Sequence, residues 1–310
     1  MRKIIMRLLV GMVLFTIIIS TSAFSFDLYA SAQALEDYPP TGEFITIDGL
    51  DIHTICIGTG DETIILFHGF AGGAIDMIPL MNELASEYQV CAFDRLGNDY
   101  SSPIPNGWSL REIQALHHNI IQNLTDAIPY VAGHSVGGGY VLSYAVLYPT
   151  RGIILLDGLS PNVADDVVNR LGSYNSLSLV AQLGLLRPIA SSFVSPDYAD
   201  NLYDNMLALR SRSNNIVGFA DEGVVVKNGL TSDSLLDAVM MLDVPLLVFA
   251  AEQVDVPEGQ AFHQSLLDLN TSYGTLSELI VIPDGKHYII ATHPSEIANS
   301  ISNWINSQVN

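Results

Sequence analysis

Gly133-His134-Ser135-Val136-Gly137 decides the fold, because this stretch places a serine between a predicted strand and a predicted helix. Residues 129–132 before it are short, apolar and β-prone, and residues 138–148 after it have helical spacing. A serine on so tight a turn is exposed at a helix N-terminus, and the glycines leave room where a Cβ would push backbones apart. The stretch therefore predicts Ser135 as a nucleophile, and a glycine-rich turn without chemistry is the alternative.

Length and charge limit the function classes. The chain has 310 residues, is 49% hydrophobic and carries a formal net charge of −21. Such a length suits one α/β domain with an insertion. With only 12 Lys and Arg, the chain is not expected to bind nucleic acid, nor an anionic membrane surface through charge.

The N-terminus predicts export. An apolar run from Leu8 to Ile19 and small residues up to Ala23 follow three basic residues, which are Arg2, Lys3 and Arg7. This layout is typical of a secretory signal within residues 1–32, cleaved after Ala23 or Ala32. An uncleaved anchor is the alternative, because the uncharged stretch 8–26 is long enough to cross a bilayer. A cleaved signal is the preferred interpretation, and in both cases the catalytic domain lies outside the membrane.

Two cysteines, Cys56 and Cys91, each lie in an apolar segment that is predicted to be a strand. In an exported protein they could form a disulfide, but buried strand cysteines more often act as small hydrophobes. Their number and spacing do not indicate a metal site.

Strands and helices alternate along most of the chain, which is typical of a parallel sheet covered on both faces. After a hairpin at 43–58, the predicted strands are 63–67, 89–93, 129–132, 152–157, 245–250 and 279–282. The predicted helices are 75–86, 109–128, 138–148, 259–270 and 294–307. From residue 159 to 242 no buried strand is apparent, and helical patterns at 177–186 and 198–212 predict a small helical insertion. The expected domains are a core of 43–158 and 243–310 and a cap of 159–242.

A serine nucleophile needs a base and a group that orients the base. The expected base is His287, because it follows the last predicted strand. The orienting carboxylate should follow a strand between the serine and the histidine. Asp255 is the preferred candidate, and Asp157 and Glu252 remain open as alternatives.

An ester or amide carbonyl also needs donors for its developing oxyanion. The backbone N–H of Val136, directly after the nucleophile, is one expected donor. The other is the N–H of Phe70, in the loop that begins His68-Gly69, with Ala71 as the fallback.

Taken together, these motifs resemble the α/β-hydrolase superfamily over essentially all of the chain beyond Glu43. The residues that carry the resemblance are His68-Gly69-Phe70, Asp94-Arg95-Leu96-Gly97, Gly133-His134-Ser135-Val136-Gly137, Val244-Pro245-Leu246-Leu247 and Gly285-Lys286-His287. The resemblance implies an eight-stranded, mostly parallel sheet with a helical cap after the sixth strand. It is closest to capped bacterial esterases and lipases. Asp99 stands where the family usually has a glycine, and Asp tolerates a left-handed backbone better than most residues.

The expected function is an exported serine hydrolase that cleaves small-molecule carboxylic esters through an acyl-serine, without a metal or organic cofactor. A cap-gated aminopeptidase similar to proline iminopeptidase is the alternative, and it would bind a substrate amine through acidic cap residues. The candidates are Asp197, Asp200, Asp204, Asp221 and Glu222. A non-catalytic binding module on the same fold is the third possibility.

Overall fold

The computed structural model of the protein describes residues 2–163, 169, 172–173, 178–252 and 259–308. An eight-stranded sheet with the order β1-β2-β4-β3-β5-β6-β7-β8 forms its centre. Only β1 with β2 and β2 with β4 pair antiparallel, and the other neighbours are parallel. The strands are β1 Glu43–Ile47, β2 Leu50–Ile57, β3 Thr63–Phe67, β4 Gln89–Phe93, β5 Tyr130–His134, β6 Gly152–Leu156, β7 Leu246–Ala251 and β8 Ser277–Ile282. The mostly parallel eight-stranded fold expected from the sequence is confirmed.

Helices cover both faces of the sheet, because its central strands are apolar on both sides. Every residue of β3, β5, β6 and β7 is buried. One face packs against α3 (Leu110–Leu124), α4 (Val136–Leu147) and α10 (Gly259–Tyr273). The other face packs against α2 (Ile78–Leu84), α11 (Ile289–Thr292) and α12 (Pro294–Gln308). Two short 3-10 helices, η1 (Ala74–Met77) and η5 (Gly274–Leu276), precede α2 and β8.

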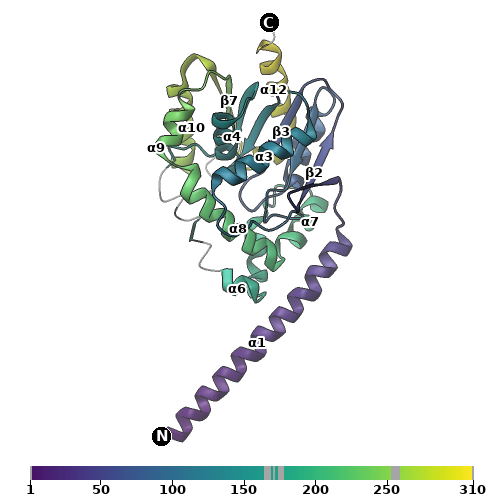
Figure 1. Ribbon diagram of the computed structural model, residues 1–310, viewed down its shortest axis with the longest axis vertical. Helices are drawn as coiled ribbons and strands as arrows, with labels where there is room; N and C mark the ends of the chain where they lie inside the picture. Colours follow the sequence, from purple (N-terminus) through teal and green to yellow (C-terminus); the bar gives the residue numbers. More distant parts are fainter. Residues whose placement is uncertain (1, 164–168, 170–171, 174–177, 253–258, 309–310) are drawn as a thin grey trace.

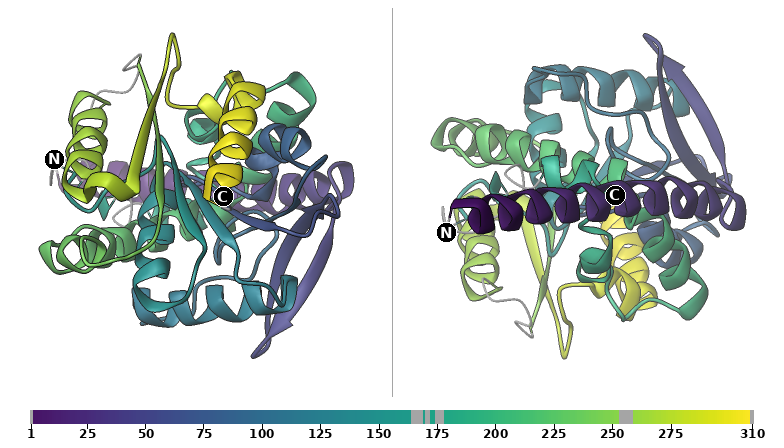
Figure 2. Two further views of the ribbon diagram at one scale, coloured as in Figure 1. Left: turned by 90° about the horizontal axis from the view of Figure 1, so that it is seen from above. Right: turned by 90° about the horizontal axis from the view of Figure 1, so that it is seen from below.

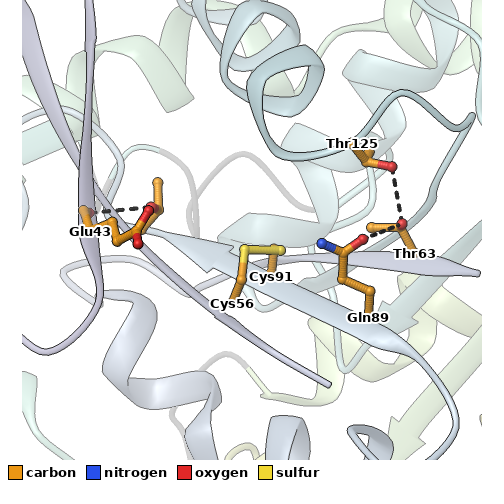
Figure 3. The surroundings of a disulfide bond; sticks show 7 residues. Glu43, Cys56, Thr63, Gln89, Cys91 and Thr125 are labelled. Atoms are coloured by element: carbon orange, nitrogen blue, oxygen red, sulfur yellow. Dashed lines mark hydrogen bonds between the residues drawn. A yellow bond between two sulfur atoms is a disulfide. The ribbon is translucent and has the colours of Figure 1, made fainter. Parts of the chain in front are cut away.

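The N-terminal hairpin brings the two cysteines together. Its turn uses Asp48 and Gly49, whose φ angles are 51° and 80°, as a tight hairpin turn requires. The hairpin places Cys56 of β2 directly opposite Cys91 of β4. The two residues form a disulfide (Figure 3). Beside it, the hydroxyl of Thr63 is hydrogen-bonded to Gln89 Oε1 and to the hydroxyl of Thr125. The preferred interpretation of two separate buried thiols was therefore wrong.

Between β6 and β7 the chain forms a helical insertion, as expected from the sequence. We call its described residues between 159 and 242 the cap. Its helices are α6 (Ser178–Gln182), η3 (Arg187–Phe193), α7 (Asp200–Arg210), α8 (Ser213–Val225), η4 (Val226–Leu230) and α9 (Asp233–Val239). The helix expected at 177–186 is shorter, because Gly184 takes a left-handed φ of 72° and Pro188 follows. Residue 177 lies outside the described part.

The N-terminal segment is one long helix, α1 (Arg2–Asp37), of 36 residues. It projects from the cap end of the globular part, on the side away from the C-terminus (Figure 1), and crosses in front of the rest of the molecule when viewed from below (Figure 2). Its apolar 18-residue window has a mean hydropathy of 2.3 and none of that window is buried. By length and composition α1 could cross a membrane, although a signal sequence would have the same features.

Candidate active site

Ser135 lies on a strained turn between β5 and α4. Its φ of 52° and ψ of −126° are unusual for a residue with a side chain. The flanking glycines make this turn possible, because a Cβ on Gly133 would lie 2.2 Å from the carbonyl oxygen of Gly137. A Cβ on Gly137 would in turn lie 2.3 Å from the carbonyl oxygen of Phe67 in β3. The strand-to-helix turn expected from the sequence is thus present, and it directs Ser135 to the carboxyl edge of the sheet.

His287, in the loop after β8, reaches Ser135. Its Nε2 lies 2.9 Å from Ser135 Oγ, and its Nδ1 lies 2.6 Å from Asp157 Oδ2. A carboxylate only accepts hydrogen bonds, so we assign the proton to Nδ1 and leave Nε2 to accept from the serine hydroxyl. The side chains of His287 and Asp157 are 14% and 7% exposed, so their contact is largely shielded from water.

Asp157 is held rigidly at the end of β6. Its backbone N–H donates to the carbonyl of Phe249, and its Oδ1 accepts from the N–H of Ala251 across 3.0 Å. These two contacts with β7 fix the carboxylate and aim Oδ2 at His287. A φ of 47° at Asp157 turns the chain away from the sheet at this point.

The carboxylate that contacts His287 Nδ1 is Asp157, which the sequence left open as an alternative to the preferred candidate, Asp255. Asp255 lies outside the described residues. The other alternative, Glu252, is exposed and its Oε2 accepts from the backbone N–H of Asp284 across 3.0 Å. Glu252 thus joins the loops after β7 and β8 and does not orient the histidine. Asp157 could reach the same histidine because β6 and β7 are neighbours whose carboxyl ends meet at one edge.

His134 supports the histidine loop, a role that the sequence did not reveal. Its Nε2 lies 2.9 Å from the backbone carbonyl of His287, and the two rings are 5.0 Å apart. Burial, together with the nearby His287, lowers the pKa of His134 to about 3. A neutral imidazole therefore donates this hydrogen bond at physiological pH. In the sequence, the only signal for this role was the position of His134 directly before Ser135.

The loop after β3 passes beside the serine. A Cβ on Gly69 would lie 3.2 Å from Ser135 Cβ, so glycine allows this close approach. The carbonyl of Gly69 accepts from three groups: Arg95 Nη2 at 2.8 Å, His68 Nδ1 at 2.8 Å and the N–H of Gly72 at 3.2 Å. These donors fix the plane of the Gly69–Phe70 peptide. In a trans peptide the N–H points opposite to the carbonyl, so the same contacts set the direction of the Phe70 N–H.

Val136, the second expected donor, is the first residue of α4. Its N–H belongs to the first turn, where amides have no acceptor within the helix. Val136 thus follows Ser135 in the chain, and Phe70 follows Gly69, whose backbone passes beside Ser135. Their role in binding a substrate oxygen stays a prediction.

Arg95 links this loop to the cap. Its Nη1 donates to the carbonyl of His68 at 2.5 Å, and its Nε donates to Glu222 Oε1 of α8 at 2.7 Å. Both side chains of this ion pair are almost completely buried. Glu222 therefore balances the charge of Arg95 inside the protein.

Two further histidines, His117 and His293, make contacts of other kinds. His117 of α3 is buried among aromatic rings, and burial lowers its pKa well below the usual value. His293 is half-buried, and its Nδ1 lies beside the hydroxyl of Thr292. Within the described residues, no group of three or more His, Cys, Asp and Glu side chains is placed to hold a metal ion.

Comparison with known proteins defines the family. A family model described as the alpha/beta hydrolase fold matches residues 62–294. The chain belongs to the α/β-hydrolase fold family. Its matched region includes Ser135, Asp157 and His287, so the contacts described above lie within the family fold.

Relatives of this hydrolase-fold chain are distant. It is 31% identical over 134 residues to the dihydrolipoyllysine-residue acetyltransferase component of the acetoin cleaving system of Cupriavidus necator, a match that covers 43% of this chain and 36% of that protein. It is 25% identical over 216 residues to a 2-hydroxy-6-oxononadienedioate/2-hydroxy-6-oxononatrienedioate hydrolase of Cupriavidus pinatubonensis. This match covers 61% of this chain and 72% of that protein. The match to the first relative thus spans little more than a third of that protein.

Solved structures share the α/β-hydrolase fold at low identity. A carboxylesterase from the thaumarchaeon Nitrososphaera gargenis has a TM-score of 0.69 and 15% identity, over 86% of this chain and 99% of that one. A bacterial membrane phospholipase A also has a TM-score of 0.69 and 15% identity, over 100% of both chains. These likenesses show the fold.

Proposed function

We propose that the protein is an exported, membrane-associated serine hydrolase that cleaves carboxylic esters, with Ser135, His287 and Asp157 as its catalytic triad. The observation that carries the proposal is the continuous contact from Ser135 Oγ through His287 to Asp157, with distances of 2.9 and 2.6 Å. A serine hydroxyl becomes a useful nucleophile only when such a base is in place.

In this mechanism Ser135 Oγ attacks the ester carbonyl while His287 Nε2 takes the hydroxyl proton. The negative charge on the carbonyl oxygen is stabilised by the N–H groups of Phe70 and Val136. His287, held by Asp157, then donates its proton to the departing alcohol, which leaves an acyl-Ser135. A water molecule, deprotonated by His287, attacks the acyl group, and collapse of the second intermediate releases the acid and restores Ser135.

Two features of the chain support export and membrane association. The Cys56–Cys91 disulfide is typical of oxidising compartments. Helix α1 provides an apolar segment of membrane-spanning length behind the basic residues at positions 2, 3 and 7.

Labelling with a fluorophosphonate probe and turnover of p-nitrophenyl esters test the proposal. We expect the wild-type protein to be labelled and to turn over the ester, and Ser135→Ala to lose both. A matched control is Ser143→Ala, which changes a buried serine of α4 away from the turn. Persistent labelling of the Ser135→Ala protein, or no labelling of correctly folded wild type, would contradict the assignment.

Cleavage of a carbon–carbon bond is a second candidate. It is favoured by the similarity over 72% of the length of the 2-hydroxy-6-oxononadienedioate hydrolase. Comparing turnover of such a dienoate with turnover of a short acyl ester separates the two reactions. An amine-binding peptidase is less well supported, because Glu222 is paired with Arg95 and Asp200 and Asp204 are exposed on α7.

A further inference from the structure

Three large apolar side chains are exposed at the end of the cap. Leu179 and Val180 of α6 are 71% and 36% exposed, and Ile189 of η3 is 44% exposed. We call these three residues the apolar cap edge. In Figure 1, α6 is the part of the cap that extends furthest along α1 and away from the C-terminus. The edge therefore lies on the side of the molecule from which the apolar helix projects.

A buried ion pair ties α1 to this part of the cap. Asp27 is only 5% exposed, although it directly follows the uncharged apolar run of α1. Its Oδ1 accepts from Arg187 Nη1 at 3.0 Å, and its Oδ2 accepts from Ser213 Oγ at 2.5 Å. A carboxylate is costly to bury without such partners, so these contacts fix the position of Asp27 against η3 and α8.

Close packing continues one turn towards the N-terminus of α1. A Cβ on Gly184 would lie 2.7 Å from Asp27 Cβ and 2.8 Å from the carbonyl oxygen of Ala23, so glycine permits the contact. Ala23 is four residues before Asp27, which is about 6 Å along a helix. The segment between α6 and η3 therefore lies beside the apolar run itself. Beside this contact lies an open, mostly apolar cavity of about 600 Å³, lined by Ala23, Phe26 and Leu185 among others.

The length of the run sets the depth of these groups in a bilayer. The 19 uncharged residues from Leu8 to Phe26 span about 28 Å as a helix, close to the ~30 Å of a hydrocarbon core. When this run crosses the membrane, the basic residues lie at one interface and Asp27 lies at the other. The level of Ala23, which the cap reaches, is then inside the boundary between headgroups and acyl chains.

We infer that the apolar cap edge is a second membrane-contact surface, which enters the outer boundary of the same bilayer that α1 crosses. The partner is the lipid surface, whose acyl chains cover Leu179, Val180 and Ile189 and enter the cavity beside Phe26. The Asp27–Arg187 pair holds the cap at this depth. The inference rests on the membrane association proposed above and does not depend on ester hydrolysis.

Site-directed fluorescence on the full chain tests this surface. The Ser135→Ala protein is placed in phosphatidylcholine nanodiscs, and an NBD fluorophore is attached at Leu179→Cys or Ile189→Cys. The native cysteines are bonded to each other and do not react. The matched control is Met241→Cys, an 85% exposed apolar position of the cap outside the edge. We expect lipids with a shallow doxyl group to quench NBD at positions 179 and 189 at least threefold more than at position 241.

Equal quenching at all three positions would overturn the inference, as would a membrane fraction that contains only chains cleaved after Ala23 or Ala32. Arg187→Gln tests the role of the ion pair: the protein should stay in the membrane fraction through α1, while quenching at position 179 falls. Arg151→Gln, which removes an exposed pair with Glu62, is its control and should leave quenching unchanged. Because no readout uses turnover, failure of this inference is distinguishable from failure of the proposed esterase activity.

Discussion

Arg95 Nε donates to Glu222 Oε1 across 2.7 Å, and this buried pair joins the cap to the loop beside the nucleophile. The other end of the guanidinium holds the carbonyls of His68 and Gly69. The direction of the Phe70 N–H, which would stabilise the oxyanion, therefore depends on a cap residue. Arg95 thus connects the position of the cap to that of the loop beside Ser135.

Glu222→Ala should consequently lower kcat more than it raises KM. The change leaves Arg95 buried without its partner and allows the Gly69–Phe70 peptide to move, so we expect a loss of about tenfold or more in kcat and about 3–5 kcal/mol in unfolding free energy. Glu222→Gln keeps an acceptor for Arg95, so its losses in kcat and in unfolding free energy should be smaller. Asp221→Asn, on the same helix, is the control. Steady-state kinetics with a melting curve for each variant would reject the coupling if kcat changed only in proportion to the folded fraction.

Asp157→Asn should reduce kcat by about 10³- to 10⁴-fold, because an amide cannot hold the His287 tautomer as a carboxylate does. KM and the melting temperature should change little, since the side chain keeps its size and its acceptor for Ala251 N–H. Asp255→Asn provides the comparison, and its kcat should stay within about threefold of wild type. A larger loss of kcat for Asp255→Asn than for Asp157→Asn would show that Asp255 is the carboxylate that orients His287.

The two aspartates also show where prediction from sequence reaches its limit. The buried parallel strands were located nearly to the residue, because each is a continuous apolar run, and Ser135 and His287 followed from their positions after β5 and β8. Asp157 and Asp255 both follow neighbouring strands that end at one edge of the sheet. Asp157 reaches His287 while its Oδ1 accepts from the N–H of Ala251, and residue order does not contain that information.

Contacts between residues that are far apart in the sequence could not be predicted either. Arg95 and Glu222 are 127 positions apart, and in a chain with 33 acidic residues nothing distinguishes Glu222 from its neighbours. The disulfide required the register between β2 and β4, because only that pairing sets Cys56 opposite Cys91. Local patterns therefore predicted elements, while side-chain pairing between elements needed the three-dimensional structure.

Asp99 should make stability depend on pH. Burial, with repulsion from Asp94 and Asp76, raises its pKa to about 7, although Arg210 and Arg212 act in the opposite direction. Its Oδ1 also accepts from Asn215. An unfolded Asp has a pKa of about 3.9, so between about pH 4 and pH 7 the folded state binds more protons and stability contributed by this group falls as pH rises.

Asp99→Asn should remove this dependence, because the amide is neutral and tolerates the φ of 37° at this position. Melting temperatures measured from pH 5 to pH 8 should decline less steeply for the variant than for wild type, and the variant should be the more stable protein at pH 8. Asp204→Asn changes an exposed carboxylate of α7 and serves as the control. Parallel curves for wild type and Asp99→Asn would contradict the raised pKa.

Cys56→Ser should destabilise the fold without altering the active site. The disulfide closes a loop between positions 35 residues apart, and removing such a bond costs roughly 3–4 kcal/mol, or a fall of roughly 5–6 °C in melting temperature for a chain of this size. Because the bond lies between β2 and β4, at the opposite side of the sheet from β6 to β8, kcat at 25 °C should be retained. Reductant should lower the melting temperature of wild type towards that of the variant and leave the variant unchanged. If reductant changes neither protein and both melt together, the two cysteines do not form a bond in solution.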